Sequence, residues 1–299
     1  MDAHQHLWDL QRFHLPWLDG VPTLRRGFLP AEYREAAAGA GIVQSVFVEA
    51  DVAEPEMLAE AQYVCAAAAR GEAASIAAIV AAARPEADDF RLHLDRLAAL
   101  GPIVKGVRRV LHTQPDGWGE TPRFTENVRA LAAYGFSFDL CLRARQLETA
   151  RHLARACPQV TFILDHGGNP PIAGGEIGPW RRMIREIAQP DNVNCKISGL
   201  VTQAGRGRAS TAHLRPYVEH CIECFGWGRV MFGSDWPVCT PHATLADWLA
   251  TLRRIVAGET AEHHRQLFAA TAARVYRLPA PPAAADGSPE PAVPAGARR

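Results

Sequence analysis

The stretch FSFDLCLRARQLETARHLARACPQVTFILDH, residues 136–166, decides the fold class of this 299-residue chain. Two short and mostly apolar runs, residues 136–142 and 160–166, flank a segment at 145–156 whose apolar residues recur at helical spacing. Mostly continuous apolar runs are typical of parallel strands that are buried on both faces. The stretch therefore predicts a strand–helix–strand unit of an α/β protein.

The same alternation extends over the rest of the chain, up to a last helix at 260–276. Strands are predicted at the start of the chain and at 43–50, 75–82, 103–111, 136–142, 160–166, 193–198 and 229–235. Eight strand–helix units fit a single (β/α)8 barrel, a TIM barrel, which typically needs about 250 residues. A doubly wound open sheet is the alternative, but it predicts a glycine-rich phosphate turn after an early strand, and the sequence has none.

Composition limits the functional class. Thirty-two basic and 32 acidic side chains give a formal net charge of zero, so we expect no binding to nucleic acid or to a membrane surface. No apolar run reaches the ~18 residues of a membrane-spanning helix, and no signal peptide is visible. The seven cysteines are an odd number, which fits poorly with a disulfide framework. We therefore expect reduced thiols and a cytoplasmic protein.

The chain divides into a body and a tail. Residues 1–278 are expected to form the barrel as one domain. Residues 279–299 are rich in Pro and Ala, and this composition predicts a disordered tail.

Polar residues occur at most of the predicted strand ends. In a TIM barrel the active site forms at the carboxyl ends of the strands. The residues are His4 and His6 in the first strand, Glu49 and Asp51, Arg108 and Arg109, Asp139, Asp165 and His166, Lys196 and Ser198, and Ser234 and Asp235 in the last. The sequence therefore predicts one polar site at the mouth of the barrel.

Two histidines and an aspartate are the first candidates for chemistry. Residues i and i+2 of a strand point to the same face, so His4 and His6 are expected to face one metal ion or one substrate oxyanion. Asp235 directly follows an apolar strand, where a carboxylate can ligate a metal or accept a proton from water. The alternative for Asp235 is an N-cap, but the next helical pattern starts only near residue 243. By the same reasoning His166 is a candidate, whereas Asp165 should point the other way and form a structural salt bridge.

Two cations are candidate substrate ligands. A guanidinium such as Arg108 can clamp a carboxylate or polarise a carbonyl at a strand end, and Lys196 can do likewise. A Schiff base on Lys196, or a structural ion pair for either side chain, remains an open alternative. The nine other histidines, including His112 and His220, lie mostly on predicted helices or loops and are expected at the surface.

The chain resembles the amidohydrolase-2 family of the amidohydrolase superfamily, in particular sugar-lactone hydrolases of the L-fuconolactonase type and, more distantly, pyrone-dicarboxylate lactonases. The matching segments, in family order, are DAHQHLWDL, VFVEAD, KGVRRVLH, FDLCLRARQL, FILDHGGNPPI, NVNCKISGLV and RVMFGSDWPVC. They extend from residue 2 to about residue 240, which is most of the body.

The resemblance implies roles for individual residues. His4 and His6 are similar to the family's strand-1 pair, His166 to its strand-6 histidine and Asp235 to its strand-8 aspartate, which implies catalytic roles and the ligands of any metal. Arg108 is similar to the strand-4 arginine that contacts the substrate. The implied cofactor is one divalent metal such as Zn²⁺, although the lactonase branch includes members that hydrolyse without one.

Some positions depart from the family pattern. Asp139 and Cys141 stand where metal-dependent members often place a histidine, and Arg109 stands where relatives often carry one. The end of the fourth strand offers no lysine for carboxylation, since Lys105 lies early in it. A binuclear metal site is therefore not expected.

We therefore expect a hydrolase that opens a sugar lactone such as L-fuconolactone to the sugar acid, with water activated by Asp235. Glu49, Arg108 and Lys196 are expected to bind this small-molecule substrate.

Trp8 and Trp17 are expected to form an apolar wall beside the sugar. One alternative is a metal-dependent hydrolase or decarboxylase of a carboxylated aromatic or muconolactone-like substrate. Another is a non-catalytic binding barrel, but polar residues at seven of eight strand ends are hard to explain by binding alone. A homo-oligomer is compatible with the sequence.

Overall fold

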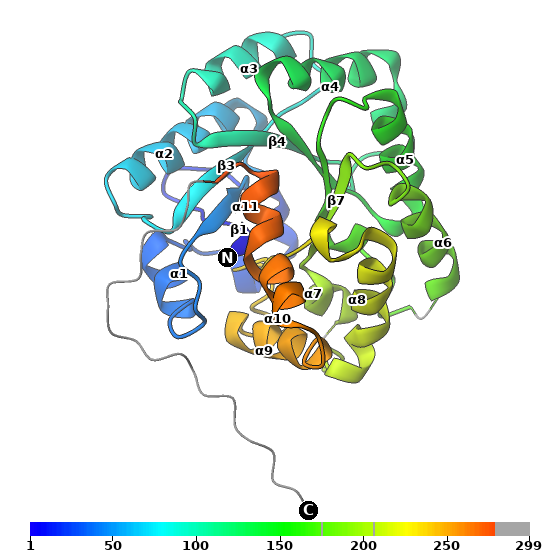
Figure 1. Cartoon of the computed structure of the whole chain (residues 1–299). Coiled ribbons are helices and arrows are strands. Elements are labelled where there is room, and N and C mark those ends of the chain that lie inside the picture. The colour runs from blue at the N-terminus through cyan, green and yellow to red at the C-terminus, as the bar shows by residue number, and fades with distance from the viewer. Residues whose placement is uncertain (175, 206, 279–299) are drawn as a thin grey trace, which may run out of the picture.

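The computed structural model describes residues 1–174, 176–205 and 207–278. Eight parallel strands form one sheet in the order of the chain, with helices around its outer face (Figure 1). The strands are β1 (Asp2–Gln5), β2 (Ser45–Val48), β3 (Ile76–Ala82), β4 (Val104–Val110), β5 (Ser137–Cys141), β6 (Phe162–Leu164), β7 (Val193–Ile197) and β8 (Val230–Phe232). The predicted tail, residues 279–299, lies outside the described residues.

The sheet closes between β1 and the end of β8. Gln5 forms a parallel bridge with Trp236. The backbone N–H of Asp235 donates to His4 O at 2.8 Å, and that of His6 donates to Trp236 O at 2.7 Å. The predicted TIM barrel is therefore confirmed, and the doubly wound open sheet is wrong.

Each predicted helix is present, with ends that differ by a few residues. The helices are α1 (Pro30–Ala36), α2 (Met57–Ala69), α3 (Phe90–Ala98), α4 (Pro122–Tyr134), α5 (Leu147–Ala156), α6 (Ile177–Ile187), α7 (Leu200–Ala204), α8 (Thr211–Phe225), α9 (Leu245–Ile255), α10 (Ala261–Arg265) and α11 (Thr271–Val275). Helix α7 was not predicted, because five residues are too few to show a helical period. The predicted helix at 260–276 consists of α10, a π-helical turn at Gln266–Ala270 and α11.

Helix α4 shows how the sequence sets these boundaries. The Thr121 side chain accepts a hydrogen bond from Phe124 N at 3.3 Å, and Pro122 occupies the first helical position. Both features satisfy or remove backbone donors that a helix start leaves unpaired. Gly135 ends the helix with a φ of 65°, which a residue without Cβ adopts at little cost.

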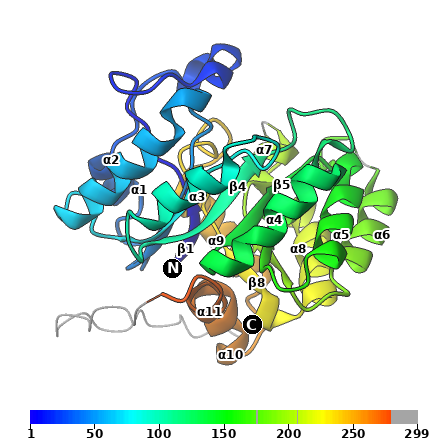
Figure 2. The ribbon, with the colours of Figure 1, turned by 90° about the horizontal axis from the view of Figure 1, so that it is seen from above.

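The interior of the barrel is apolar at the amino-terminal ends of the strands. Strand residues meet α11 and Tyr276 in one buried cluster, which contains Ala3, Val46, Val48, Ala78, Val80, Ile163, Met231, Ala272, Val275 and Tyr276. Figures 1 and 2 show α11 across this end of the barrel, next to the amino terminus. Because α11 covers the amino-terminal end, the barrel is open to ligands at its carboxyl end.

The seven cysteines are free of disulfide bonds, as predicted. Five of them are buried, and Cys65 and Cys224 are partly exposed. Over the ranges 1–174, 176–205 and 207–278, no helix combines the length and the apolar character that crossing a membrane requires.

The close approach of β4 and β5 at Gly106 generates a prediction about stability. A Cβ atom on Gly106 would overlap Ser137 Oγ and lie 2.8 Å from Ser137 O. We expect Gly106→Ala to lower the free energy of unfolding, measured by urea denaturation, by about 2 kcal/mol or more. Gly228→Ala is the control, because a Cβ there meets no atom within 4 Å. Equal effects of the two substitutions would contradict the packing argument.

Candidate active site

A cavity of about 700 Å³ opens at the carboxyl ends of the strands. This volume is typical of sites for small molecules. The strand ends contribute His6, Arg108, His166 and Asp235 to its wall, and the loops and α7 contribute Trp17, Asp51, His112, Arg143, Asn169, Thr202 and Gln203, among others. The cavity therefore lies where the sequence placed the polar site.

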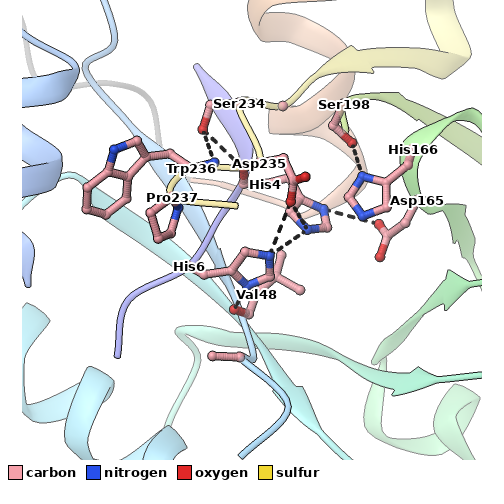
Figure 3. A network of polar contacts seen from close by, with 12 residues as sticks. His4, His6, Val48, Asp165, His166, Ser198, Ser234, Asp235, Trp236 and Pro237 are labelled. Carbon is pink, nitrogen blue, oxygen red and sulfur yellow. Dashed lines mark hydrogen bonds and ion pairs between the residues drawn. The ribbon is translucent and has the colours of Figure 1, made fainter. Parts of the chain in front are cut away.

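His4, His6 and Asp235 form a compact cluster at the base of this cavity. His4 Nε2 lies 3.1 Å from His6 Nε2 and 3.7 Å from Asp235 Oδ1. His6 Nε2 lies 3.5 Å from the same Asp235 oxygen. Figure 3 shows the two imidazoles and the carboxylate turned toward one another. The structure thus brings together His4 and Asp235, which are 231 residues apart in the sequence.

Backbone carbonyls fix the orientation of the His6 ring. His6 Nδ1 lies 2.8 Å from Val48 O and 3.0 Å from Glu49 O. Because both neighbours can only accept, Nδ1 carries the ring proton and Nε2 carries a lone pair. The lone pair faces His4 and Asp235, as a metal-ligating histidine requires.

The spacing within the cluster suits a zinc ion. A tetrahedral zinc ion with bonds of 2.0–2.1 Å places its ligand atoms about 3.3 Å apart. The three separations among His4 Nε2, His6 Nε2 and Asp235 Oδ1 are 3.1, 3.5 and 3.7 Å. Two imidazoles and a carboxylate are also a donor set that zinc prefers.

The charge of the surrounding network also suits a divalent cation. The network contains more buried carboxylates than buried cations, and its members are Arg108, Lys196, Glu49, Asp139, Asp165 and Asp235. The two cations leave two of the four carboxylates without a compensating charge. Buried charge without a counter-charge is costly, and one divalent cation would balance it.

The backbone is strained around the cavity. Asp51, His166, Asn169 and Asp235 have φ values of 54°, 56°, 49° and 58°. All four line the cavity. Non-glycine residues rarely adopt this left-handed conformation, which persists where the surroundings enforce it and occurs often at functional sites.

His166 is oriented by two neighbours from the end of β7. Its Nδ1 lies 2.9 Å from Ser198 Oγ. A Cβ on Gly199 would lie 2.5 Å from that same nitrogen, so the ring packs directly against the Gly199 backbone. With Nδ1 held by Ser198, Nε2 is the nitrogen left to serve a ligand. Burial lowers the pKa of His166, which favours the neutral ring.

Asp165 forms the predicted salt bridges, but its predicted direction is wrong. Its Oδ1 lies 3.3 Å from His4 Nδ1 and its Oδ2 lies 3.4 Å from Arg108 Nη1, both inside the barrel. The His166 ring centroid is 4.6 Å from that of His4, so consecutive residues reach the same partner. The positive φ of His166 in the turn after β6 breaks the alternation of a regular strand.

Arg108 and Glu49 form a buried pair. Arg108 Nε donates to Glu49 Oε1 at 2.6 Å, and Nη2 donates to Glu49 O at 2.7 Å. Burial alone raises the pKa of Glu49, but the Arg108 and Arg84 charges outweigh it and hold that pKa below its usual value. Arg108 lines the cavity, and Glu49 does not. Glu49 therefore orients Arg108, and its placement does not support the predicted contact with substrate.

Lys196 is fully buried beneath the cavity and is not part of its wall. Its Nζ lies 2.5 Å from Asp139 Oδ2 and 3.1 Å from Asp165 Oδ1. Burial raises the pKa of Asp139 to about 6, against the opposing charge of Lys196. For Asp165 the charges of Lys196 and His4 outweigh burial, and the pKa lies well below its usual value. This placement does not support the predicted substrate contact or the alternative of a Schiff base, and it matches the alternative of an internal ion pair.

The two predicted aromatic wall residues have different positions. Trp17 lines the cavity, and its Nε1 donates to Ala50 O at 2.8 Å. Trp8 is buried behind it, with the two rings edge to face at a centroid distance of 5.6 Å. Trp17 can therefore contact a ligand, whereas Trp8 supports it.

Sequence reasoning missed several residues of the cavity wall. His112 was expected at the surface but lines the cavity, with Nδ1 3.1 Å from Cys141 Sγ. His220 is buried and lies 3.0 Å from Arg181 O, so its surface prediction is also wrong. Asn169 and Gln203 share a hydrogen bond of 2.8 Å in the wall.

These residues share a reason for being missed. Apart from His220, which lies on the long helix α8, they lie in loops or short helices, where no periodicity marks the direction of a side chain. The resemblance covered two of them, because His112 ends the segment KGVRRVLH and Asn169 lies within FILDHGGNPPI.

A comparison with known proteins identifies one family, and two relatives match most of this chain and most of their own length. A sequence model of the amidohydrolase family matches residues 1–278. The chain is 29% identical to L-fucono-1,5-lactonase of Burkholderia ambifaria over 255 residues, which covers 84% of this chain and 85% of that protein. It is also 29% identical to L-fucono-1,5-lactonase of Burkholderia multivorans over 295 residues, which covers 94% and 97%.

A solved structure shares the fold. The structure of an amidohydrolase from Burkholderia multivorans with bound zinc is 28% identical in sequence and superimposes with a TM-score of 0.83. The match covers 93% of this chain and 99% of that chain.

The contact between Gly199 and His166 generates a prediction. Gly199→Ala forces Cβ against the His166 ring, and at a φ of 62° it also strains the backbone. We expect a crystal structure of the variant to show His166 displaced from Ser198, and urea denaturation to show a loss of about 2–4 kcal/mol. Gly135→Ala is the matched control, since its φ is 65° and no atom lies within 4 Å of the added Cβ. If both variants lose the same stability and His166 does not move, the contact does not position the ring.

The environment of His112 generates a prediction about pH. Burial and the Arg108 charge lower the pKa of His112 to about 4. Between pH 6.5 and pH 4 the unfolded chain therefore binds a proton that the folded protein does not, so stability falls as the pH falls through this window. The contribution of this residue is at most about 3 kcal/mol. In urea denaturation from pH 7.5 to 4.5, we expect a smaller loss for His112→Asn than for the wild type. If the free energy of unfolding falls by the same amount with pH in the wild type and in His112→Asn, the pKa of His112 is not lowered by its surroundings.

Proposed function

The chain belongs to the amidohydrolase family, whose sequence model matches residues 1–278, and from this premise we propose that it is a hydrolase that opens the ring of a sugar lactone. The observation that carries the proposal is the cluster of His4, His6 and Asp235 at the base of a cavity of about 700 Å³. Two relatives named L-fucono-1,5-lactonase match most of the chain, which supports a lactone as the substrate.

Asp235 is the proposed general base. Its side chain lines the cavity and forms no ion pair with Arg or Lys among the described residues. An ionised carboxylate in this position can take a proton from water while the water oxygen bonds to the lactone carbonyl carbon. The bond between that carbon and the ring oxygen then breaks, and the proton passes to the ring oxygen. The products are a hydroxyl group and a carboxylic acid, which ionises and releases one proton to solvent.

Arg108 and His166 are the proposed stabilisers of charge. Glu49 and Asp165 hold the Arg108 guanidinium, but its second Nη2 proton remains for a carbonyl oxygen in the cavity. Donors fixed in advance at the point where negative charge develops are usually a large term in catalysis. His166, with Nδ1 held by Ser198, offers Nε2 to the water or to the departing ring oxygen.

His4, His6 and Asp235 are the residues that would hold a divalent metal such as Zn²⁺, and His166 lies beside them. A bound metal would supply Lewis acidity, which lowers the pKa of water and polarises a carbonyl. The solved relative with zinc supports this assignment.

The upper wall of the cavity suits a sugar. Trp17 offers an apolar face, and Thr202, Gln203 and Asn169 offer polar groups on α7 and the loop after β6. Thr202 Oγ1 is buried without a hydrogen-bond partner among the described residues. A pocket with an apolar wall and a few fixed polar groups orients a polyhydroxylated ring.

A carboxylated substrate is the second candidate. Arg143 lines the cavity, and its guanidinium has no ion-pair partner in the described part of the chain. A free guanidinium in a cavity binds carboxylates well. Hydrolysis or decarboxylation of a carboxylated aromatic or muconolactone-like substrate would use this residue.

The decisive test is proton release in a weakly buffered indicator assay. The panel contains L-fucono-, L-galactono-, D-arabinono- and L-rhamnono-lactone, together with carboxylated aromatics. We expect turnover of at least one lactone, and we expect Asp235→Asn to lower kcat by about 10²- to 10⁴-fold because it removes the base. The exposed Asp88→Asn serves as the matched control and should retain wild-type turnover.

The outcomes separate the candidates. Turnover of no lactone would contradict the proposed function, and turnover of a carboxylated aromatic alone would establish the second candidate. Near wild-type kcat in Asp235→Asn would remove Asp235 from the mechanism. A parallel assay after chelation tests the metal. Activity that is lost and then restored by Zn²⁺ would show that His4, His6 and Asp235 act primarily as metal ligands.

A further inference from the structure

Two side-chain carboxamides in the wall of the cavity form a chain of hydrogen bonds that joins α7 to the loop after β6. Asn169 Nδ2 donates to Leu142 O at 2.7 Å, and Gln203 Nε2 donates to Asn169 Oδ1 at 2.8 Å. Both side chains are half-buried and line the cavity. The chain of hydrogen bonds therefore begins at the end of β5 and ends at a surface that a ligand would contact.

The backbone carbonyl at the start of this chain fixes its direction. A carbonyl oxygen can only accept, so Leu142 O requires the NH2 group of Asn169, and the Asn169 oxygen then faces Gln203. That oxygen in turn requires the NH2 group of Gln203. The other atom of the carboxamide, Gln203 Oε1, has no hydrogen-bond partner among the groups that the structure describes, and it is accessible to solvent. The wall thus presents an oriented oxygen that can accept but not donate.

Both carboxamides are held in place relative to His166. The backbone N–H of Asn169 donates to His166 O at 3.0 Å, and that of Gln203 donates to Gly199 O at 3.2 Å. Gly199 is the residue whose backbone packs against the His166 ring. Gly199 and Gln203 are about one helical turn apart on α7. The free Gln203 oxygen is therefore positioned against the same ring that the proposed mechanism uses.

A structural link between α7 and the loop accounts for only part of this arrangement. Such a link uses the NH2 group of Gln203 and the side chain of Asn169. It does not use the oxygen that faces the cavity. A ligand that displaces water from this oxygen without offering a donor leaves a buried acceptor unpaired, which lowers affinity about 10- to 100-fold. The cavity therefore selects for a hydrogen-bond donor at this point.

We propose that Gln203 is a specificity-determining residue that accepts a hydrogen bond from a hydroxyl group of the substrate, and that Asn169 is the positioning residue that orients it. The inference rests on the proposed function and deepens it, because it names the chemistry of the lactone that this wall accepts. The lactone carries a free hydroxyl group on the side that faces α7. An ionised carboxylate has no proton to donate, so a substrate that places one against α7 is disfavoured.

Replacing the hydroxyl groups of a lactone one at a time tests the contact. The probes are L-galactono-lactone and derivatives in which each hydroxyl group is replaced by hydrogen or by fluorine, which cannot donate. L-Fucono-lactone is the derivative without the 6-hydroxyl group. Affinity is measured by calorimetry in Asp235→Asn, which lacks the proposed base, and kcat/KM is measured in the wild type. At one position we expect both replacements to lower affinity and kcat/KM about 10- to 100-fold, because Gln203 Oε1 loses its donor.

Substitution of Gln203 should remove this penalty. In Gln203→Met, which keeps the length of the side chain, we expect the parent lactone to lose affinity and its derivatives at that position to bind as tightly as the parent. Asn169→Gly removes the orienting amide, and glycine adopts the φ of 49° at this position without strain. The Gln203 carboxamide is then free to turn, so we expect a smaller penalty than in the protein that retains Asn169.

The matched control is Gln189→Met, because Gln189 is exposed after α6 and its Nε2 donates to Arg185 O at 3.2 Å. It should leave every affinity unchanged. The proposal is overturned if no probe binds, if no hydroxyl position shows a penalty, or if Gln203→Met weakens all probes by the same factor, which would indicate a structural link alone.

The two readouts separate this inference from the proposed function. Probes that bind with the expected penalty but are not hydrolysed by the wild type would contradict the proposed function and support the contact with Gln203. Hydrolysis without a penalty at any hydroxyl position would support the proposed function and overturn the contact.

Discussion

Hydrogen bonds between the first strand and the segment after the last strand hold the site together. Asp2 is buried at this seam, where its Oδ1 accepts from Ser234 N at 2.8 Å and from His4 N at 3.1 Å. The Asp2 Oδ2 atom accepts from Ser234 Oγ at 2.5 Å and from Tyr33 Oη at 2.9 Å. The backbone of Asp235 then bonds to His4 O. Because His4 and Asp235 come from the two sides of the seam, closing the barrel is the same event as assembling the candidate metal ligands.

The interior of the barrel changes character along its axis, and this change separates stability from chemistry. The amino-terminal half is filled by apolar strand residues and closed by α11. Above it lies a layer of buried charges, in which Lys196 and Arg108 bridge three carboxylates. The two cations each contact two carboxylates, and a low local dielectric makes those contacts strong. The layer holds His4 and Arg108 rigidly at the point where the solvent-accessible cavity begins.

The sequence was sufficient to predict the architecture and the cluster at its centre, because strand patterns carry a period and strand ends meet at one edge. It was insufficient where that regularity ends. Asp165 turns inward because His166 has a positive φ, which no pattern of apolar residues reveals. Lys196 was predicted to reach the substrate, since its position on a strand gives a face of the sheet but not a depth along the barrel. His112 and Gln203 reach the cavity from segments without periodicity, so only coordinates could place them.

The division between strands and loops also limits what similarity to relatives can establish. His4, Arg108 and Asp235 are held by the barrel itself, so a chain that shares the fold and these residues shares the geometry needed for hydrolysis. The outer wall is built differently: Trp17, His112, Arg143 and Gln203 come from loops and from α7, which can change in length and sequence without disturbing the strands. The names of relatives at 29% identity therefore bear on the proposed sugar less than this chain's own wall residues do. If the proposed function holds, discrimination among lactones arises from the hydrogen bonds that this wall makes with a substrate, since a polar group left unpaired in such a cavity is costly.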